Sequence, residues 1–162
     1  MMGEPDASRP YMPGYGIAGP ADGRGLLPWS WAEKRLVESY RYWVISTGGR
    51  PWPHAMPVWG VWHESAFWFS TGGRSRKTRN LRIEPRCTLH TDTVDPVVVE
   101  GTAAVAPAGD RLDEVIACYH AKYPMEPPDL ADNPVFVITP HWAFGLVEAE
   151  FTASPTRWLF AP

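Results

Sequence analysis

Positive charge is concentrated in Gly72–Arg86, although the 162-residue chain carries a net charge of −3. The basic side chains of this segment are Arg74, Arg76, Lys77, Arg79, Arg82 and Arg86, against a single acid, Glu84. They begin where a Gly-Gly turn leads into a predicted helix, so free backbone N–H groups and the positive end of the helix dipole meet there. Together with the hydroxyls of Thr71 and Ser75, these groups predict a phosphate-binding site.

The same charge pattern also fits a solvated basic helix face, and the spacing alone does not decide between the two. Nucleic-acid binding is a weaker interpretation, because one short basic helix without interleaved aromatic residues binds weakly and without sequence preference. We therefore expect no nucleic-acid partner. The segment is neither a Walker loop nor a dinucleotide-binding fingerprint, since its lysine spacing and surroundings differ from both.

Two further segments could complete a binding site. Pro53 and Pro57 interrupt the backbone ladder of the strand predicted at His54–Trp62, so its free backbone groups could bind a flat heterocycle. The alternative is an edge strand that proline protects from pairing. The aromatic residues near the end of the chain, in 140–144 and 156–160, suit either a subunit interface or plain core packing.

No acid–base or metal chemistry is indicated by the remaining reactive residues. The five histidines (His54, His63, His90, His120 and His141) contain no pair with metal-ligand spacing on one face, so no metal site is expected. Cys87 and Cys118 are predicted to be buried thiols of a reducing compartment. A binding site without an evident catalytic set indicates that a cofactor carries the chemistry, and the catalytic residues stay unknown.

The pattern of the chain predicts a flexible arm over residues 1–28 and one β-rich domain over residues 29–162. A helix should begin at Ser30, with Glu33 completing a capping box, and others should follow Ser75 and cover 110–123. Strands are expected at 42–47, 54–62, 66–71, 86–91, 96–106, 135–139, 143–149 and 156–160. This antiparallel order predicts a β-barrel with helical caps. Without a membrane span or signal peptide, a cytoplasmic protein is expected.

The chain resembles a known family through an ordered set of motifs over about residues 29–160. They are Tyr42–Thr47 (YWVIST), Gly49–Pro51 (GRP), Met56–Gly60 (MPVWG), Phe67–Thr71 (FWFST), Ser75–Leu81 (SRKTRNL), Pro85-Arg86, Val99–Gly101 (VEG) and Thr156–Trp158 (TRW). This order is similar to the pyridoxamine-phosphate-oxidase-like split-barrel superfamily, and within it to the flavin/deazaflavin oxidoreductases of class B.

The resemblance implies a mainly β, six-stranded antiparallel split barrel with short helices, and a homodimer that binds its cofactor at the subunit interface. The strand that would lie along the cofactor ring carries Met56, Pro57, Val58 and Trp59. The residues that would hold the phosphate are Ser70, Thr71, Ser75, Arg76 and Lys77. Asn80 matches the deazaflavin branch, and the candidates for completing the site from the partner chain are Trp142, Phe144 and Trp158.

The implied activity is an oxidoreductase that uses coenzyme F-420, a deazaflavin, to transfer hydride to a small electron-poor organic acceptor. Arg74, Arg79 and Arg82 favour the deazaflavin because its polyglutamate tail is anionic. FMN is the alternative cofactor, in a reductase or oxidase of the same fold, and a non-catalytic carrier of a flavin-like or haem-like ring is a further alternative. His54 and Trp59 replace basic residues of the true oxidase, so vitamin B6 oxidation is not expected.

Overall fold

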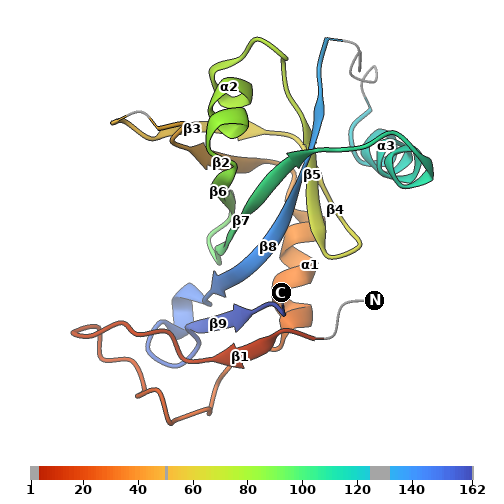
Figure 1. The fold of residues 1–162 in the computed structure, drawn as a ribbon. Coiled ribbons are helices and arrows are strands. Elements are labelled where there is room, and N and C mark those ends of the chain that lie inside the picture. The colour runs from red at the N-terminus through yellow and green to blue at the C-terminus, as the bar shows by residue number, and fades with distance from the viewer. Residues whose placement is uncertain (1–3, 50, 125–131, 162) are drawn as a thin grey trace.

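The protein is described here by a computed structural model that covers residues 4–49, 51–124 and 132–161. These residues form nine strands and three α-helices, and every strand pair is antiparallel (Figure 1). The helices are α1 (Trp29–Glu38), α2 (Arg76–Ile83) and α3 (Asp110–Lys122), with a short 3₁₀ turn, η1 (Glu148–Glu150). The strands are β1 (Asp6–Ser8), β2 (Tyr42–Ser46), β3 (His54–Val58), β4 (Val61–His63), β5 (Ala66–Ser70), β6 (Arg86–Thr91), β7 (Val97–Val105), β8 (Val135–Gly145) and β9 (Thr156–Leu159). The mainly β split-barrel fold is confirmed, with nine strands described where six were expected.

The sheet runs in the order β1-β9-β8-β7-β6-β2-β3, and β5 and β4 lie off this path. Strand β8 pairs with β7 along most of its length, with β5 over Val135–Ile138 and with β9 over Trp142–Gly145. The prediction of two separate strands here was wrong. Pro140 lies opposite Gly101 where the register shifts, and such a bulge tolerates a residue without an N–H.

The predicted strand over residues 54–62 is also divided, because β3 and β4 separate at Gly60. The Gly60 N–H donates to the Tyr123 hydroxyl (3.1 Å), and Lys122 Nζ donates to the Gly60 carbonyl (3.3 Å). These side chains from the end of α3 replace the ladder bonds that β3 and β4 give up at the break. Strand β3 then lies at the edge of the sheet beside β2, as its prolines predicted.

Alternating side chains of the barrel strands form the core. In β2, Tyr42, Val44 and Ser46 point inward, and Trp43 and Ile45 point outward. The aromatic rings of β5 and β9 fill the interior, and each buried ring of this kind stabilises the fold by roughly 1.5–3 kcal/mol. The side chains of β2, β6, β7 and β8 that point away from this core form one surface, which we call the outer sheet face.

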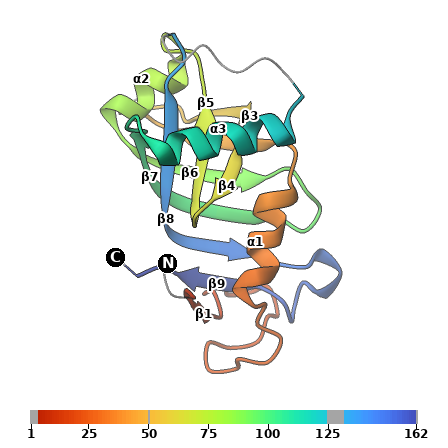
Figure 2. The same cartoon turned by 90° about the vertical axis from the view of Figure 1, so that its right-hand side faces the viewer.

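The helices cover the barrel at different places (Figures 1 and 2). Helix α1 packs Trp29, Ala32 and Leu36 on the core and begins after Pro28, so the predicted cap at Ser30 was wrong. Pro28 occupies the N-cap position with extended backbone, and no side chain caps the first turn. Helix α3 crosses near β5 in Figure 2, and none of the described helices is long and apolar enough to cross a membrane.

The segment predicted as an arm contributes structure to the domain. Strand β1 pairs with β9, and the buried Arg9 guanidinium donates to the carbonyls of Ala153 and Pro155 at 2.8 Å each. No sequence pattern indicates this strand, because its three small or polar residues show no alternation of apolar and polar side chains. The division into an arm and a domain stays a prediction.

Candidate cofactor site

The start of α2 is built as its sequence predicts. Ser75 is the N-cap, and its Oγ accepts a hydrogen bond from the Thr78 backbone N–H at 3.2 Å. The Thr78 hydroxyl donates to the Gly72 carbonyl at 2.8 Å, which fixes the Gly-Gly turn against the helix. The turn and the first helical residues therefore form a rigid base for the side chains that project from them.

Lys77 is the unusual residue of this base, because it is a cation with only 7% of its surface exposed. Its Nζ donates to Thr71 Oγ1 at 3.1 Å, and this oxygen lies 3.4 Å from Ser75 Oγ. Among the described residues, no carboxylate forms an ion pair with Lys77. Burial lowers the pKa of its ammonium group, since a buried charge loses hydration. The fold thus holds a desolvated cation beside two hydroxyls.

These groups open into a pocket of about 380 Å³. Its lining residues are Arg41, Pro57, Val58, Trp59, Ser70, Thr71, Lys77 and Tyr119. The sequence predicted most of them from three separate segments, and the fold brings those segments together. It missed Arg41 and Tyr119: Arg41 ion-pairs with Asp92 at 2.9 Å, and Tyr119 belongs to the apolar face of α3. Lys77 remains the lining cation without an acid.

Four of the predicted phosphate and ring residues do not line the pocket: Met56, Ser75, Arg76 and Asn80. Ser75 borders the neighbouring groove at the Gly-Gly turn instead. Met56 is 44% exposed on the edge strand β3. Arg76 is exposed, and its Nη2 donates to the Trp52 carbonyl at 3.2 Å. Asn80 is buried and donates to the backbone carbonyl and hydroxyl of Ser46 at 3.4 and 3.3 Å, so it ties α2 to β2. Met56 and Arg76 would therefore need a larger ligand or a partner chain to meet a cofactor in this pocket, whereas buried Asn80 acts by positioning α2.

The positive charges of α2 also affect His54 on β3. Its pKa is lowered first by burial and then by the charges of Arg76 and Lys77. The other excess cations are placed differently, since Arg74 and Arg82 line a separate groove of about 710 Å³ beyond the Gly-Gly turn. An anionic tail bound by those two residues would have to run past the N-terminus of α2.

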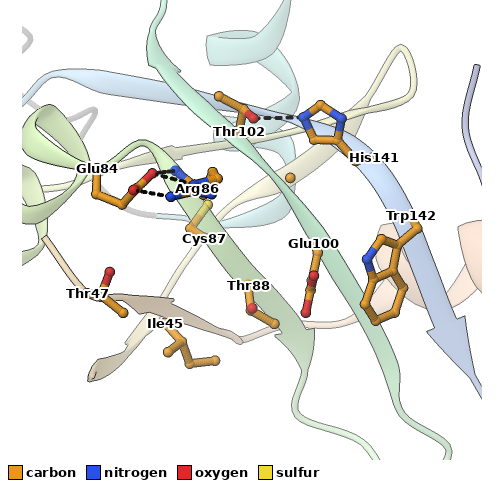
Figure 3. A pocket seen from close by; sticks show the side chains of 11 residues that line it. Ile45, Thr47, Glu84, Arg86, Cys87, Thr88, Glu100, Thr102, His141 and Trp142 are labelled. Carbon is orange, nitrogen blue, oxygen red and sulfur yellow. Dashed lines mark hydrogen bonds and ion pairs between the residues drawn. The ribbon is translucent and has the colours of Figure 1, made fainter. Parts of the chain in front are cut away.

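The three aromatic candidates do not share one location. Trp142 borders a groove of about 630 Å³ on the outer sheet face, where it stands beside Glu100 (Figure 3). Phe144 is half-buried on the same face two residues further along β8. Trp158 is fully buried, donates its Nε1–H to the Leu27 carbonyl at 3.2 Å and packs on Trp31. It has no surface for a cofactor or a partner, so its assignment to the site is corrected to a core residue.

The comparison with protein families settles the relationship of this chain. The family model described as Pyridoxamine 5'-phosphate oxidase matches residues 32–146, from α1 to the residue after β8. The chain belongs to this family. The matched segment contains the whole pocket at Lys77, and proteins of the pyridoxamine 5'-phosphate oxidase family bind flavins.

Solved structures support the same fold at low sequence identity. A haem-binding protein from Mycobacterium smegmatis is 18% identical with a TM-score of 0.61, and the match covers 70% of this chain and 52% of that protein. A putative pyridoxamine 5'-phosphate oxidase from Listeria innocua is 16% identical with a TM-score of 0.61, covering 72% and 96%. An F420 reductase is 20% identical with a TM-score of 0.53, covering 67% and 91%. This chain thus spans about half the length of the mycobacterial protein. No curated protein matches the sequence.

Proposed function

We propose that this protein is an oxidoreductase that binds the deazaflavin coenzyme F-420 and transfers hydride to a small electron-poor organic acceptor. The observation that carries the proposal is the buried Lys77 ammonium, which no described carboxylate neutralises. Burying a cation without a counter-ion is costly. An anionic ligand in the pocket would supply the missing charge, and the linker phosphate of a flavin-type cofactor is such an anion.

The residues of the pocket fit such a group. Lys77 gives a charge-assisted donor, and the Thr71 hydroxyl, whose oxygen accepts from Lys77, can donate to a further phosphate oxygen. Ser75 supports Thr71 from outside the pocket, since its own hydroxyl donates to Thr78 Oγ1 at 3.1 Å. Trp59 is 43% exposed and, with Tyr119, offers an aromatic wall for a planar ring. The volume of about 380 Å³ lies within the range of ordinary small-molecule sites.

When bound, the deazaflavin supplies hydride chemistry at its central ring carbon. The chain's own residues would hold the cofactor ring in place and exclude water from it. Pro57 and Val58 line the pocket on the edge strand. Pro57 has no backbone N–H, so it offers no donor that would hold a water molecule there. A fixed ring beside an aromatic wall holds an acceptor in a reactive orientation, which is where the gain in rate would arise. No side chain is assigned as a proton donor.

FMN is the alternative cofactor, because its phosphate would satisfy Lys77 equally well. What favours the deazaflavin is the additional positive charge beside the α2 N-terminus, where Arg74 and Arg82 line a groove that an anionic tail could enter. The F420 reductase among the structural neighbours is consistent with this choice. A non-catalytic carrier is the second candidate, since neighbours include a haem-binding protein from Mycobacterium smegmatis and a haem storage protein from Vibrio cholerae.

The test is a side-by-side titration of the purified protein with coenzyme F-420, FMN and haemin, followed by fluorescence or absorbance. The proposal expects the tightest binding for F-420. Lys77→Met should weaken it by about 2 kcal/mol, or roughly 30-fold, as the loss of one charge-assisted hydrogen bond. Lys34→Met changes an exposed cation on α1 that has no part in the proposed site and is the matched control. Equal affinity in wild type and Lys77→Met would refute the phosphate assignment, and turnover of enone or quinone-like acceptors separates an enzyme from a carrier.

We also propose that the protein is a homodimer in which the outer sheet face is covered by a second copy. Proteins of this family are often dimeric. The side chains on this face that are apolar and only partly buried are Trp43, Ile45, Val98, Trp142 and Phe144, with Leu159 52% exposed at its border. Such a face is typical of an interface. It would bring Trp142 and Phe144 of one chain toward the cofactor of the other.

Light scattering after size-exclusion chromatography tests the dimer. Phe144→Arg places a charge on the outer sheet face and should shift the protein to the monomer mass. Val105→Arg changes a residue that is 50% exposed at the end of β7 and serves as the control. A monomeric wild type would refute the dimer while leaving the Lys77 titration to judge the cofactor proposal separately.

A further inference from the structure

A second group of chemically reactive side chains lies where the turn after β4 packs against α3. His63 ends β4 and Glu64 follows it in the turn, while Glu114 and Cys118 lie about one helical turn apart on α3. This turn is at the opposite end of β5 from Ser70, so the group is separate from the proposed cofactor pocket. None of these residues has a part in the proposed function.

The geometry of three of these residues is that of metal ligands. His63 Nε2 lies 3.4 Å from Glu114 Oε2, and one ligand atom from each of His63, Glu64 and Glu114 lies within 4.8 Å of the others. Two ligands of a tetrahedral zinc ion are about 3.3 Å apart, given bonds of about 2.0–2.1 Å. The Glu64 and Glu114 side chains are 56% and 62% exposed, so they are free to rotate and close the remaining distance.

The unpartnered ring nitrogen of His63 is the independent observation. Its Nε2 is buried and has no hydrogen-bond partner among the described residues. Its Nδ1 lies 3.9 Å from Cys118 Sγ. In the tautomer that carries its proton on Nδ1, directed at the sulfur, the Nε2 lone pair faces the carboxylate of Glu114, as in histidines that bind metals through one nitrogen and are oriented through the other. That arrangement places electron-rich atoms together, and a cation would relieve their repulsion.

Arg111 supplies part of the compensating charge and therefore competes with a metal. Its Nε lies 2.8 Å from Glu64 Oε2, and its guanidinium stands over the Trp68 ring at 5.1 Å. One oxygen of Glu64 and the whole carboxylate of Glu114 remain beyond this ion pair. The cluster is thus only partly neutralised by its neighbours.

We propose that His63, Glu64 and Glu114 bind a divalent transition metal ion, with Zn²⁺ as the best match to one imidazole and two carboxylates. Cys118 is a positioning residue that orients the ring. The bound ion would tie α3 to the β4–β5 turn and keep a coordination position open to solvent. No sequence pattern indicates this site, because His63 and Glu114 are far apart in the chain and only the fold brings them together.

The test is a titration of the metal-free protein with Zn²⁺ against a fluorescent zinc indicator. Wild type should bind one ion per chain. His63→Ala should bind more than about 100-fold more weakly, since even outer-shell partners are worth ~10–100-fold. His120→Ala removes an exposed histidine on the same helix and should leave the affinity unchanged. Absence of saturable binding, or equal binding by His63→Ala, would overturn the proposal.

Two further variants keep the result clear if His63→Ala is unstable. Glu114→Gln changes an exposed side chain and should also weaken binding, whereas Arg111→Gln should tighten it by removing a competing positive charge. Unchanged affinity in Glu114→Gln would remove Glu114 as a ligand and overturn the three-residue site. Cys118→Ser should retain binding within about tenfold, because a hydroxyl can still orient the ring. A complete loss of binding in that variant would contradict the positioning role.

Discussion

The buried charge of Lys77 should lower the free energy of unfolding of the cofactor-free protein, and a bound anionic cofactor should restore it. Replacing it with Met keeps the length of the side chain and removes a buried charge that no described carboxylate pairs. Exchange of buried charge for apolar groups stabilises proteins by about 1–4 kcal/mol, and the lost hydrogen bond to Thr71 offsets about 1 kcal/mol. The middle of that range less this loss is about 1.5 kcal/mol, so we expect Lys77→Met to raise the free energy of unfolding by about 1–2 kcal/mol without cofactor. For a domain of this size that is roughly 2–8 °C in Tm.

The assay is thermal unfolding of wild type and Lys77→Met, each with and without saturating cofactor. Without cofactor, Lys77→Met should have the higher Tm. With cofactor, the difference in Tm should become smaller or change sign, because a ligand stabilises most the protein that binds it well. Lys34→Met should stay within about 0.5 kcal/mol of wild type under both conditions, since its side chain is exposed on α1.

The pH dependence of the same measurement gives an independent check. Burial lowers the pKa of Lys77 in the folded protein below the ordinary value of 10.5. Between the folded and unfolded pKa values the unfolded chain binds more protons, so this group makes stability rise with pH in that window. The gap between wild type and Lys77→Met should therefore shrink as pH rises toward 10.5. A variant less stable than wild type at neutral pH, with a gap that does not change, would refute the view of Lys77 as an uncompensated cation.

Three further predictions follow from other residues. The pKa of His54, which is lowered by burial and by the neighbouring cations of α2, should rise when an anionic cofactor binds, and NMR titration of the ring protons measures this; no change would place the anion elsewhere. Iodoacetamide at pH 8 should label Cys118 and spare Cys87, whose pKa burial raises to about 12, with mass spectrometry of the peptides as the readout; rapid labelling of Cys87 would contradict its burial. Gly60→Ala should destabilise the protein by about 1–3 kcal/mol in urea unfolding, because its Cβ would stand 2.6 Å from the Trp68 carbonyl oxygen; an unchanged midpoint would show that the strand break yields easily.

Local patterns predicted the parts of the fold that depend on neighbouring residues. The cap at Ser75, the bulge at Gly101 and the edge position of β3 were all legible, since each rests on a residue type with one strong preference. The break at Gly60 was not, because it depends on Tyr123 and Lys122 from another element.

The same distinction applies to the candidate site. The residues of α2 and of the strand before it were found from charge and glycine spacing, and the pocket at Lys77 joins them. Tyr119 was recognised only as part of an apolar helix face. Cys118, predicted to be buried, is exposed, because α3 buries a narrow stripe in which Val115 alone is fully covered. Trp158 was misplaced because an aromatic residue near the end of a chain looks the same whether it meets a partner or its own core.

The pairing of β1 with β9 constrains how the chain is made. Residues 6–8 leave the ribosome early but have no partner until residues 157–159 have been synthesised. Until then Arg9 stays hydrated, since two of its carbonyl acceptors lie at Ala153 and Pro155. Contacts so distant in sequence close late and slowly. The nascent protein would therefore form its other strand pairs before it forms this one, because β9 is the last of the described strands to be synthesised.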